Sequence, residues 1–430
     1  MLLVVKKGRE REVEDIFEKW DLHAARIGEV TGDKLLRIKD HGTVIAEVPA
    51  TALADEAPMY TRPFSEPASQ ADLRTMPALG AEPAPRDAFF TLLASPGIAS
   101  KQWIYRQYDS MVRTNTLVAA GAGAGVVRVK GTAKALAMSV DGNGRFCLLD
   151  PYEGAKLAVA EASRNVACAG GTPIGVTNCL NFGNPERPEI MWQFAEAVRG
   201  IGDACRALEL PVTGGNVSLY NETDGQAVLP TPVIGILGVV ENADHVLSRV
   251  FPAGAHDIVL LGTTKDELGG SEYLKTIHGL VRGVPPALDL ERERAVQTLV
   301  VEAASNGWAR SAHDCSDGGF AVALAECCFT GGGGADVTVA AEGPRPGGEA
   351  IAALFSESAS RVILSAADGT TGDLLARAKA LGVPAAVIGR SGGDRIRITV
   401  GGTAVIDCAT AEAEERWKNG VTRYFKERVA

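Results

Sequence analysis

The sequence predicts a mixed α+β protein that is built from several domains. Strand-like apolar runs alternate with amphipathic helical segments along most of the chain. The chain has 430 residues and is 46% hydrophobic. That is enough for the cores of roughly two to four domains. Two stretches near opposite ends of the chain also share one order of elements, as duplicated domains do.

The first copy of this duplicated unit lies at the amino-terminal end. It consists of a short strand over 1–5, a helix over 9–20 and two strands within 35–48. The second copy has its helix at 372–381. The matching residues are Ile27, Gly28 and Asp33 in the first copy, and Ile388, Gly389 and Asp394 in the second. A whole domain precedes the second copy, so we expect the chain to begin inside a domain whose last part is 1–54.

A linker and two further domains are predicted next. Prolines are spread through weakly periodic sequence over 55–103, so we expect a linker strapped along a surface. One domain is predicted over 104–243 and another over 244–430. In the first domain, strands are predicted at 126–130, 135–140, 146–149 and 232–240, helices at 151–168 and 190–208, and a hairpin turn at 141–144. In the second domain, a strand is predicted at 257–261 and helices at 289–306 and 319–328.

The composition excludes several classes of protein. A net charge of −10 argues against nucleic acid as the main partner, and no segment approaches the roughly 18 apolar residues of a membrane helix. The opening apolar run is too short for a signal peptide. The cysteines are scattered without a Cys-x-x-Cys pair, so we interpret them as reduced, mostly buried thiols of a cytoplasmic protein. A nucleophilic Cys315 beside His313 is the alternative, but nothing else argues for a thiolate there.

The stretch 211–218, read Pro-Val-Thr-Gly-Gly-Asn-Val-Ser, is the main candidate for binding chemistry. Gly214 and Gly215 lack Cβ, so their backbone can take positive φ and approach a phosphate closely. Asn216 and Ser218 then offer oxygen atoms of the kind that Mg²⁺ binds. The stretch is therefore suited to a Mg-nucleotide. The alternative is a tight turn whose Asn and Ser side chains bond their own backbone.

A second group of polar residues lies on either side of this stretch. Glu161 and Asn165 are four residues apart on the predicted helix 151–168, so their side chains share one face and could reach one metal. Asp314 and Ser316 precede the predicted helix at 319–328. They indicate either a helix N-cap or a phosphate site at the start of that helix.

Five motifs follow one another in an order that is typical of one family. They cover 150–155, 161–165, 178–185, 214–222 and 313–319. In this order they resemble the phosphoribosylformylglycinamidine synthase family in its small, multi-subunit form, and the resemblance runs from end to end of the chain. The chain looks like the C-terminal half of the large synthetase subunit of this family.

The resemblance implies a fold and a set of site residues. The fold is an aminoimidazole ribonucleotide synthetase-like pair of N-terminal and C-terminal domains, preceded by the end of a duplicated C-terminal-type domain. It implies ATP contacts at Asn178 and Gly215, a Mg²⁺ ligand at Asn216 and a substrate contact at Ser218. An auxiliary Mg-nucleotide site is implied at Glu161, Asn165, Asp314 and Ser316. The chain departs from the family at Gly123, where an aspartate is expected, at Asn178, where an aspartate is more usual, and at Ala359, where a glutamine is usual.

The resemblance also implies a reaction and its partners. ATP would phosphorylate the amide oxygen of formylglycinamide ribonucleotide, and ammonia would displace the phosphate to give the amidine. Ammonia is expected from a separate glutaminase subunit, joined through a small bridging subunit. The catalytic residues are expected upstream of Met1, so the chain is expected to be inactive without that half or a second copy. The alternatives are another ATP-dependent synthetase related to aminoimidazole ribonucleotide synthetase, and a non-catalytic nucleotide-binding scaffold.

Overall fold

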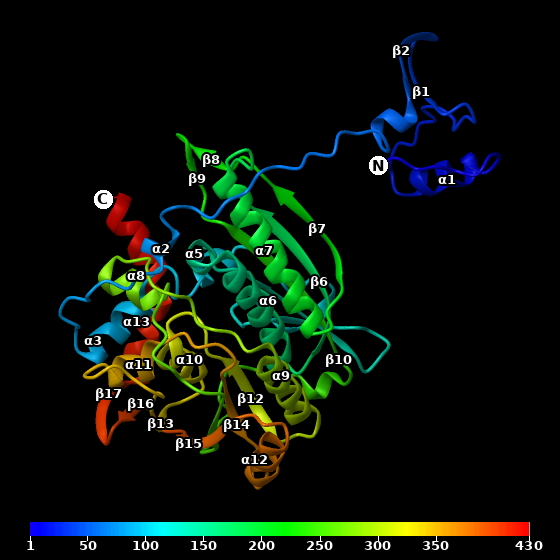
Figure 1. Ribbon diagram of the computed structural model, residues 1–430. Coiled ribbons are helices and arrows are strands. Elements are labelled where there is room, and N and C mark those ends of the chain that lie inside the picture. The colour runs from blue at the N-terminus through cyan, green and yellow to red at the C-terminus, as the bar shows by residue number, and fades with distance from the viewer. Residues whose placement is uncertain (430) are drawn as a thin grey trace. The chain divides into compact units, whose positions relative to one another are not determined.

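The computed structural model describes residues 1–429 and divides into two compact units. The smaller unit is Met1–Thr61, and the larger is Arg62–Ala430, which holds both sheets of more than two strands (Figure 1). Among residues 1–429, no helix combines the length and the apolar character that crossing a bilayer requires.

The smaller unit contains the predicted helix and strand pair. Helix α1 (Glu10–Lys19) is followed by the antiparallel strands β1 (Leu35–Asp40) and β2 (Thr43–Pro49) and by one 3₁₀ turn at Ala50–Leu53. The strand predicted at 1–5 is wrong: this segment is irregular, because no other described strand pairs with it to complete its backbone hydrogen bonds. None of residues 1–61 is buried.

The hairpin of the smaller unit has a counterpart near the end of the larger one, formed by β16 (Arg395–Val400) and β17 (Thr403–Ala409). In both hairpins the register shifts after four residue pairs, between Ile38 and Lys39 in one and between Ile398 and Thr399 in the other. Both also turn through two residues with positive φ. The matching register supports the predicted duplication of this unit.

The first sheet of the larger unit has six strands in the order β3-β4-β5-β10-β6-β7. Its strands are β3 (Thr116–Val118), β4 (Gly125–Arg128), β5 (Ala135–Asp141), β6 (Thr172–Asn181), β7 (Val212–Ser218) and β10 (Thr231–Val240). Helices α6 (Pro151–Cys168) and α7 (Pro188–Ala207) cover one face, where Val176, Ile234 and Ile236 meet Val159 and Ala197. The short hairpin β8 (Glu222–Thr223) and β9 (Gln226–Ala227) follows β7.

The segment before α6 differs from the prediction. The hairpin turn expected at 141–144 and the strand expected at 146–149 are wrong, because helix α5 (Gly144–Leu149) occupies this place. The Asn143 side chain accepts hydrogen bonds from the backbone N–H groups of Arg145 and Phe146 and so caps the helix. Phe146 and Leu149 are buried on its inner side.

The second sheet has seven strands in the order β12-β14-β11-β15-β13-β16-β17. Its other strands are β11 (Asp257–Leu261), β12 (Ala309–Asp314), β13 (Ala335–Val339), β14 (Val362–Ala366) and β15 (Ala385–Ser391). Helices lie on both faces: α9 (Leu290–Ser305) and α12 (Thr371–Ala380) on one, and α10 (Gly319–Cys328), α11 (Glu349–Phe355) and α13 (Thr410–Val429) on the other. Helix α8 (Glu272–His278) packs on the same side as α10.

The segment 55–103 is more than the expected surface linker. It contains α2 (Gln70–Leu73), α3 (Pro85–Ala94) and the start of α4 (Gln102–Tyr105). Phe89 and Leu92 of α3 are fully buried in the core of the second sheet, beside α8 and α13. The prolines concealed this helix, although Pro85 at its first turn suits a helix start.

Helix α6 joins the two sheets and is buried along nearly its whole length. Arg164 donates to the Glu293 carboxylate of α9 at 2.9 Å, and neither side chain is more than 3% exposed. Ser360 also donates to Glu293, and Gln297 donates to the same carboxylate while accepting from Ser163 of α6. These buried bonds fix the register of α6 against α9.

The contact between α6 and α7 depends on a glycine. A Cβ at Gly200 would lie 2.3 Å from the carbonyl oxygen of Tyr152 on α6, whereas a Cβ at Gly202 would meet only the flexible end of Arg206 at 3.3 Å. We therefore expect Gly200→Ala to destabilise the fold by about 2 kcal/mol, although alanine favours helices. Gly202→Ala should be neutral or stabilise by up to about 1 kcal/mol. Chemical denaturation checks both variants, and equal stability of the two would contradict the close packing at Gly200.

Candidate functional site

The stretch 211–218 forms an edge strand rather than a loop. β7 pairs in parallel with β6 and lies at the end of the six-stranded sheet (Figure 1). The positive φ expected for Gly214 and Gly215 is wrong, and so is the alternative of a tight turn, because pairing with β6 keeps both residues extended. β7 is exposed along nearly all its length, so its residues are open to a ligand.

Gly215 is nevertheless required at its position. It pairs with Asn178 on β6, and a Cβ there would lie 2.2 Å from Asn178 Oδ1 and 2.7 Å from the Asn178 carbonyl oxygen. A Cβ at Gly214, by contrast, would have no neighbouring atom within 4 Å. The Asn178 side chain therefore lies across the backbone of Gly215, and the two residues predicted to contact ATP are in direct contact.

The other two predicted residues point to the opposite face of the sheet. Successive side chains of a strand alternate between faces, so Asn216 and Ser218 share one face while Gly215 belongs to the other. Asn216 is exposed and Ser218 is half-buried. Among the described residues neither side chain has a hydrogen-bond partner. Their oxygen atoms are thus free to bind a ligand at the open edge.

The side-chain oxygen atoms of Asn216 and Ser218 meet the needs of Mg²⁺ only in part. An amide and a hydroxyl oxygen are ligands of the kind Mg²⁺ takes, but the ion usually also needs carboxylates or substrate phosphates. Within residues 1–426, whose side chains the structure describes, no three His, Cys, Asp or Glu side chains are arranged to hold a metal ion. Asn216 therefore fits as one ligand of an ion whose remaining ligands come mainly from nucleotide phosphates and water.

Three of the four residues predicted for the auxiliary site, Glu161, Asn165 and Asp314, come together between α6 and β12. The Arg164 guanidinium of α6 lies 3.6 Å from Asp314 at the end of β12. Glu161 and Asn165 both face Asp141, a residue that the sequence indicated only as part of a turn. Ser316 follows β12 in the turn before α10. Asp141 and Arg164 are the members of this group that sequence reasoning missed.

Two carboxyl groups of this cluster, those of Asp141 and Glu161, hold protons more tightly than usual. Burial, and then the neighbouring Asp314, raise the pKa of Asp141 to about 7. Burial and the Asp141 charge raise the pKa of Glu161 well above its ordinary value. Asp314 Oδ2 is buried without a hydrogen bond. Crowded carboxyls have the chemistry of a cation site, and here the Arg164 guanidinium, 3.6 Å from Asp314 Oδ2, already supplies one positive charge.

The space beside Gly123 is filled from the opposite side. A Cβ at Gly123 would lie 2.2 Å from Asn165 Oδ1, so the Asn165 amide occupies the place into which a longer side chain at 123 would extend. The donor atoms of the cluster fit a divalent cation, but the described side chains form no ready-made metal site. A bound nucleotide would have to supply the missing ligands.

Cys315 is not an activated nucleophile. It is 1% exposed, and burial raises the pKa of its thiol to about 11. The nearby His313 pairs through Nε2 with Glu326 at 2.8 Å instead. The interpretation of Cys315 as a buried thiol is therefore confirmed, and all eight cysteines are free.

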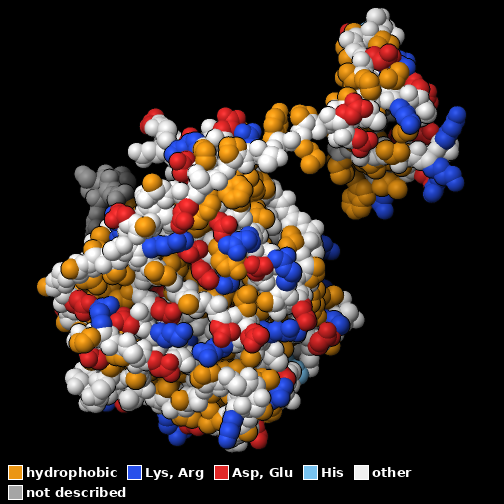
Figure 2. All heavy atoms as spheres, in the orientation of Figure 1, with side chains coloured by type: hydrophobic (Ala, Val, Ile, Leu, Met, Phe, Trp, Pro, Cys, Tyr) orange, Lys and Arg blue, Asp and Glu red, His pale blue; other side chains and the backbone are white. Residues whose placement is uncertain are grey.

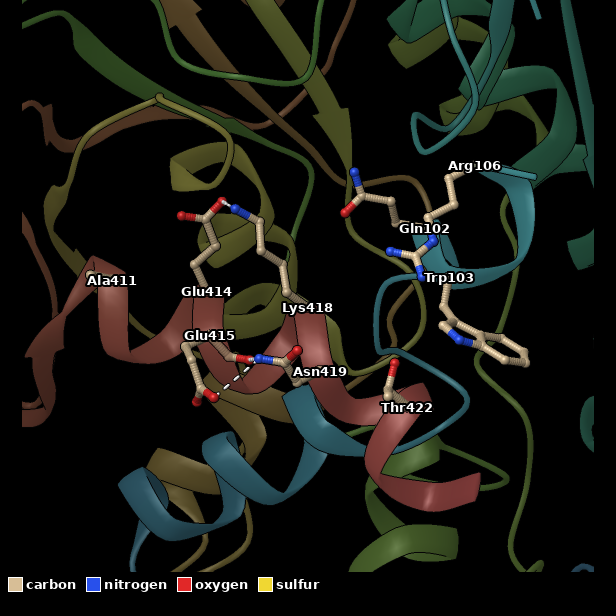
Figure 3. Close-up of a pocket in the computed structure, with 9 residues that line it drawn as sticks. All are labelled: Gln102, Trp103, Arg106, Ala411, Glu414, Glu415, Lys418, Asn419 and Thr422. Atoms are coloured by element: carbon tan, nitrogen blue, oxygen red, sulfur yellow. Dashed lines mark hydrogen bonds and ion pairs between the residues drawn. The ribbon is translucent and has the colours of Figure 1, made fainter. Parts of the chain in front are cut away.

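A pocket of about 490 Å³ lies elsewhere, between α4 and α13 (Figure 3). Trp103 and Arg106 line one side, and Glu414, Lys418 and Asn419 line the other. Lys418 pairs with Glu414 at 2.7 Å, and Asn419 donates a hydrogen bond to Glu415 at 3.1 Å. None of the predicted site residues lines it.

On the face of the larger unit shown in Figure 2, basic and acidic side chains are interspersed.

The sequence matches two family descriptions. "AIR synthase related protein, N-terminal domain" matches residues 121–240, and "AIR synthase related protein, C-terminal domain" matches residues 256–401. Together they cover most of the larger unit. They confirm the predicted pair of N-terminal-type and C-terminal-type domains.

Curated relatives match nearly the whole chain. Phosphoribosylformylglycinamidine synthase subunit PurL of Moorella thermoacetica is 49% identical over 424 residues, and subunit PurL of an Anaeromyxobacter species is 47% identical over 446 residues. The alignments cover 98% and 100% of this chain but 57% of each relative. The chain thus spans little more than half the length of the curated relatives it matches.

Solved structures show the same fold. Thermotoga maritima PurL complexed with FGAR matches with a TM-score of 0.63 and 17% identity, over 77% of this chain and 54% of that one. The same protein complexed with ATP matches with a TM-score of 0.60 and 20% identity, over 90% of this chain and 54% of that one. At these identities the likeness concerns the fold.

A further buried carboxyl, Glu357, gives the fold a dependence on pH. Glu357 Oε1 accepts hydrogen bonds from the backbone N–H groups of Glu272 and Gly318 at 2.8 and 2.7 Å, while Oε2 is buried without a partner. Burial, and then the charge of Asp317, raise the pKa of Glu357 to about 8 from its ordinary 4.5. The folded chain therefore binds this proton more tightly than the unfolded chain does.

The stability that comes from this proton is fully present below pH 4.5 and is lost as the pH rises towards about 8. Glutamine does not titrate, so the stability of Glu357→Gln should not fall as the pH rises through this range. We therefore expect its free energy of unfolding, relative to that of the wild type, to increase by on the order of 2 kcal/mol from the low-pH end to the high-pH end. Urea denaturation at several pH values measures the difference. Glu291→Gln, at an exposed position of α9, controls for the lost charge. A constant difference between Glu357→Gln and wild type across the range would contradict the raised pKa.

Proposed function

Because the chain belongs to the phosphoribosylformylglycinamidine synthase PurL family, we propose that it takes part in ATP-dependent amidine formation. The substrates are formylglycinamide ribonucleotide, ammonia and ATP, and the products are formylglycinamidine ribonucleotide, ADP and phosphate. The observation that carries the proposal is the exposed edge strand β7, where Gly215 lies against Asn178 and where Asn216 and Ser218 are free of internal bonds. PurL of Thermotoga maritima complexed with FGAR and with ATP supports the same substrates.

Each residue of this edge has a role in the proposal. Asn178 and the bare backbone of Gly215 contact ATP at the exposed edge of the sheet. Asn216 is a ligand of Mg²⁺, which when bound neutralises phosphate charge during transfer. Ser218, two residues further along the same face, hydrogen-bonds the ribonucleotide. No general base is assigned among these residues.

The chemistry explains what the positioning groups of this edge contribute. An amide oxygen is a poor leaving group, so transfer of the γ-phosphoryl group to that oxygen makes it displaceable by ammonia. Phosphoryl transfer is accelerated mainly by alignment of the reactants and by neutralisation of charge. A strand edge with free polar side chains aligns the reactants and forms no covalent bond with the substrate.

Several further parts of the proposal concern the complete enzyme. Ammonia comes from a glutaminase subunit through a small bridging subunit, and the catalytic residues lie outside these 430 residues or are supplied by a second copy. Glu161, Asn165, Asp314 and Ser316 hold an auxiliary Mg-nucleotide. The eight free cysteines support a location in the reducing cytoplasm.

ADP release tests the proposed function. The complete enzyme, given ATP, Mg²⁺, formylglycinamide ribonucleotide and ammonium, should release ADP only when all four are present. The 430-residue chain by itself should show no turnover. Turnover of the single chain that needs both ribonucleotide and ammonium would mean that it holds a whole active site. ADP release by the complete enzyme that ignores the ribonucleotide would exclude the proposed reaction.

The contact between Gly215 and Asn178 predicts a contrast between neighbouring glycines. Gly215→Ala displaces Asn178, because the new Cβ would lie 2.2 Å from its Oδ1, and should raise KM for ATP about tenfold or more. Gly214→Ala places its Cβ in open space and should leave KM nearly unchanged. Steady-state kinetics of the complete enzyme measures both. Equal effects of the two substitutions would exclude the assigned ATP contact.

Removal of the Asn216 side chain should affect the metal requirement and not the fold. Asn216 is exposed and has no internal bond, so Asn216→Ala should leave the melting temperature unchanged. We expect turnover at limiting Mg²⁺ to fall about tenfold and to recover at high Mg²⁺. Wild-type turnover of this variant at limiting Mg²⁺ would show that Asn216 is not a ligand.

A further inference from the structure

Tyr220, just beyond the end of β7, has a strained backbone. Its φ is +60°, in the left-handed region that a bulky side chain rarely adopts. Such a conformation costs free energy and persists only where the surrounding structure enforces it. In known proteins these residues are concentrated at ligand-binding and active sites.

Hydrogen bonds on both sides of Tyr220 enforce this conformation. The Tyr220 N–H donates to the carbonyl of Gly183 at 3.0 Å, and the Asn221 N–H donates to the carbonyl of Phe182 at 3.1 Å. The Asn221 side-chain amide donates to the carbonyls of Ser218 at 2.7 Å and Phe182 at 3.1 Å. The corner after β7 is thus clamped to the segment that follows β6.

Glu222 extends the same clamp. Its carboxylate accepts the N–H of Asn184 at 2.9 Å and lies 3.6 Å from the guanidinium of Arg187. The clamp therefore holds the ends of β6 and β7 together, with Tyr220 at its centre. One of the carbonyl groups held by this clamp is that of Ser218, the last residue of β7.

Burial of the Tyr220 ring does not offset the free-energy cost of its positive φ, because the side chain is largely exposed. The residue as a whole is 54% exposed, and its hydroxyl makes one hydrogen bond, to the Glu186 carboxylate at 3.2 Å. If backbone geometry alone mattered, glycine would suit this position better than tyrosine. The aromatic ring is thus exposed on a backbone that is held in a costly conformation, and it is available for contact with a ligand.

We propose that Tyr220 is a substrate-binding residue whose ring packs against the ribose of the ribonucleotide bound at Ser218. This inference rests on the proposed function. The ribonucleotide is favoured over ATP because of where Tyr220 lies along the chain. It follows Ser218, the last residue of β7, whereas Gly215 lies in the middle of the strand. The face of a sugar ring carries C–H groups that pack well on an aromatic ring, and the clamp holds this surface in place before the substrate arrives.

The test compares Tyr220→Gly with Tyr220→Phe in the complete enzyme, with ammonium as the nitrogen source. Glycine relieves the strain and removes the ring, so we expect an unchanged or higher melting temperature together with a KM for formylglycinamide ribonucleotide raised about tenfold. KM for ATP should stay within about twofold of wild type. Tyr220→Phe keeps the ring and should bind the ribonucleotide nearly as wild type does.

Thr330→Gly is the matched control. Thr330 also has positive φ, at +58°, but lies after α10 in the other domain. This variant should gain stability without a change in either KM. A wild-type KM for the ribonucleotide in Tyr220→Gly, an increase confined to KM for ATP, or a lower melting temperature would overturn the inference. If the wild-type enzyme itself releases no ribonucleotide-dependent ADP, the proposed function fails and this inference fails with it.

Discussion

The arrangement of the larger unit depends on the buried ion pair between Arg164 of α6 and Glu293 of α9. The pair lies where the two sheets meet, and Ser360 and Gln297 complete its hydrogen bonds. Glu293 and the other surrounding charges keep the pKa of Arg164 above its ordinary value despite burial. Removing one member of such a pair leaves an uncompensated buried charge, so the contact acts mainly by permitting one register between the helices.

This register determines what each face of α6 can do. The side that carries Glu161 and Asn165 is held against the end of β12, where their carboxyl and amide groups crowd Asp141 and Asp314. The apolar side of α6 supports the six-stranded sheet through Val159. β7 is the exposed edge strand of this supported sheet. An edge strand with unpaired polar side chains is well placed to position a ligand, whereas a mobile loop would first have to be ordered.

Much of this architecture could be predicted from the sequence, and the failures have physical causes. Helix α6 was predicted at its observed bounds because its small apolar residues recur at helical spacing between clear end signals. Gly214 and Gly215 were expected to take positive φ, since glycine favours turns, but both are extended in β7, and only Gly215 is required, by the Asn178 side chain on the neighbouring strand. Asp141 and Arg164 were missed because their roles arise only when distant segments meet. The helix α3 was missed because prolines around it suggested a linker.

The most direct test of the account is hydrogen–deuterium exchange of the complete enzyme with and without Mg-ATP. The account predicts that nucleotide slows exchange in Val212–Ser218 and in the paired strand Thr172–Asn181, and that Gly215→Ala abolishes this protection while Gly214→Ala keeps it. Protection confined to the pocket between α4 and α13, or absent from β7, would contradict the assignment of the edge strand as the nucleotide-binding element.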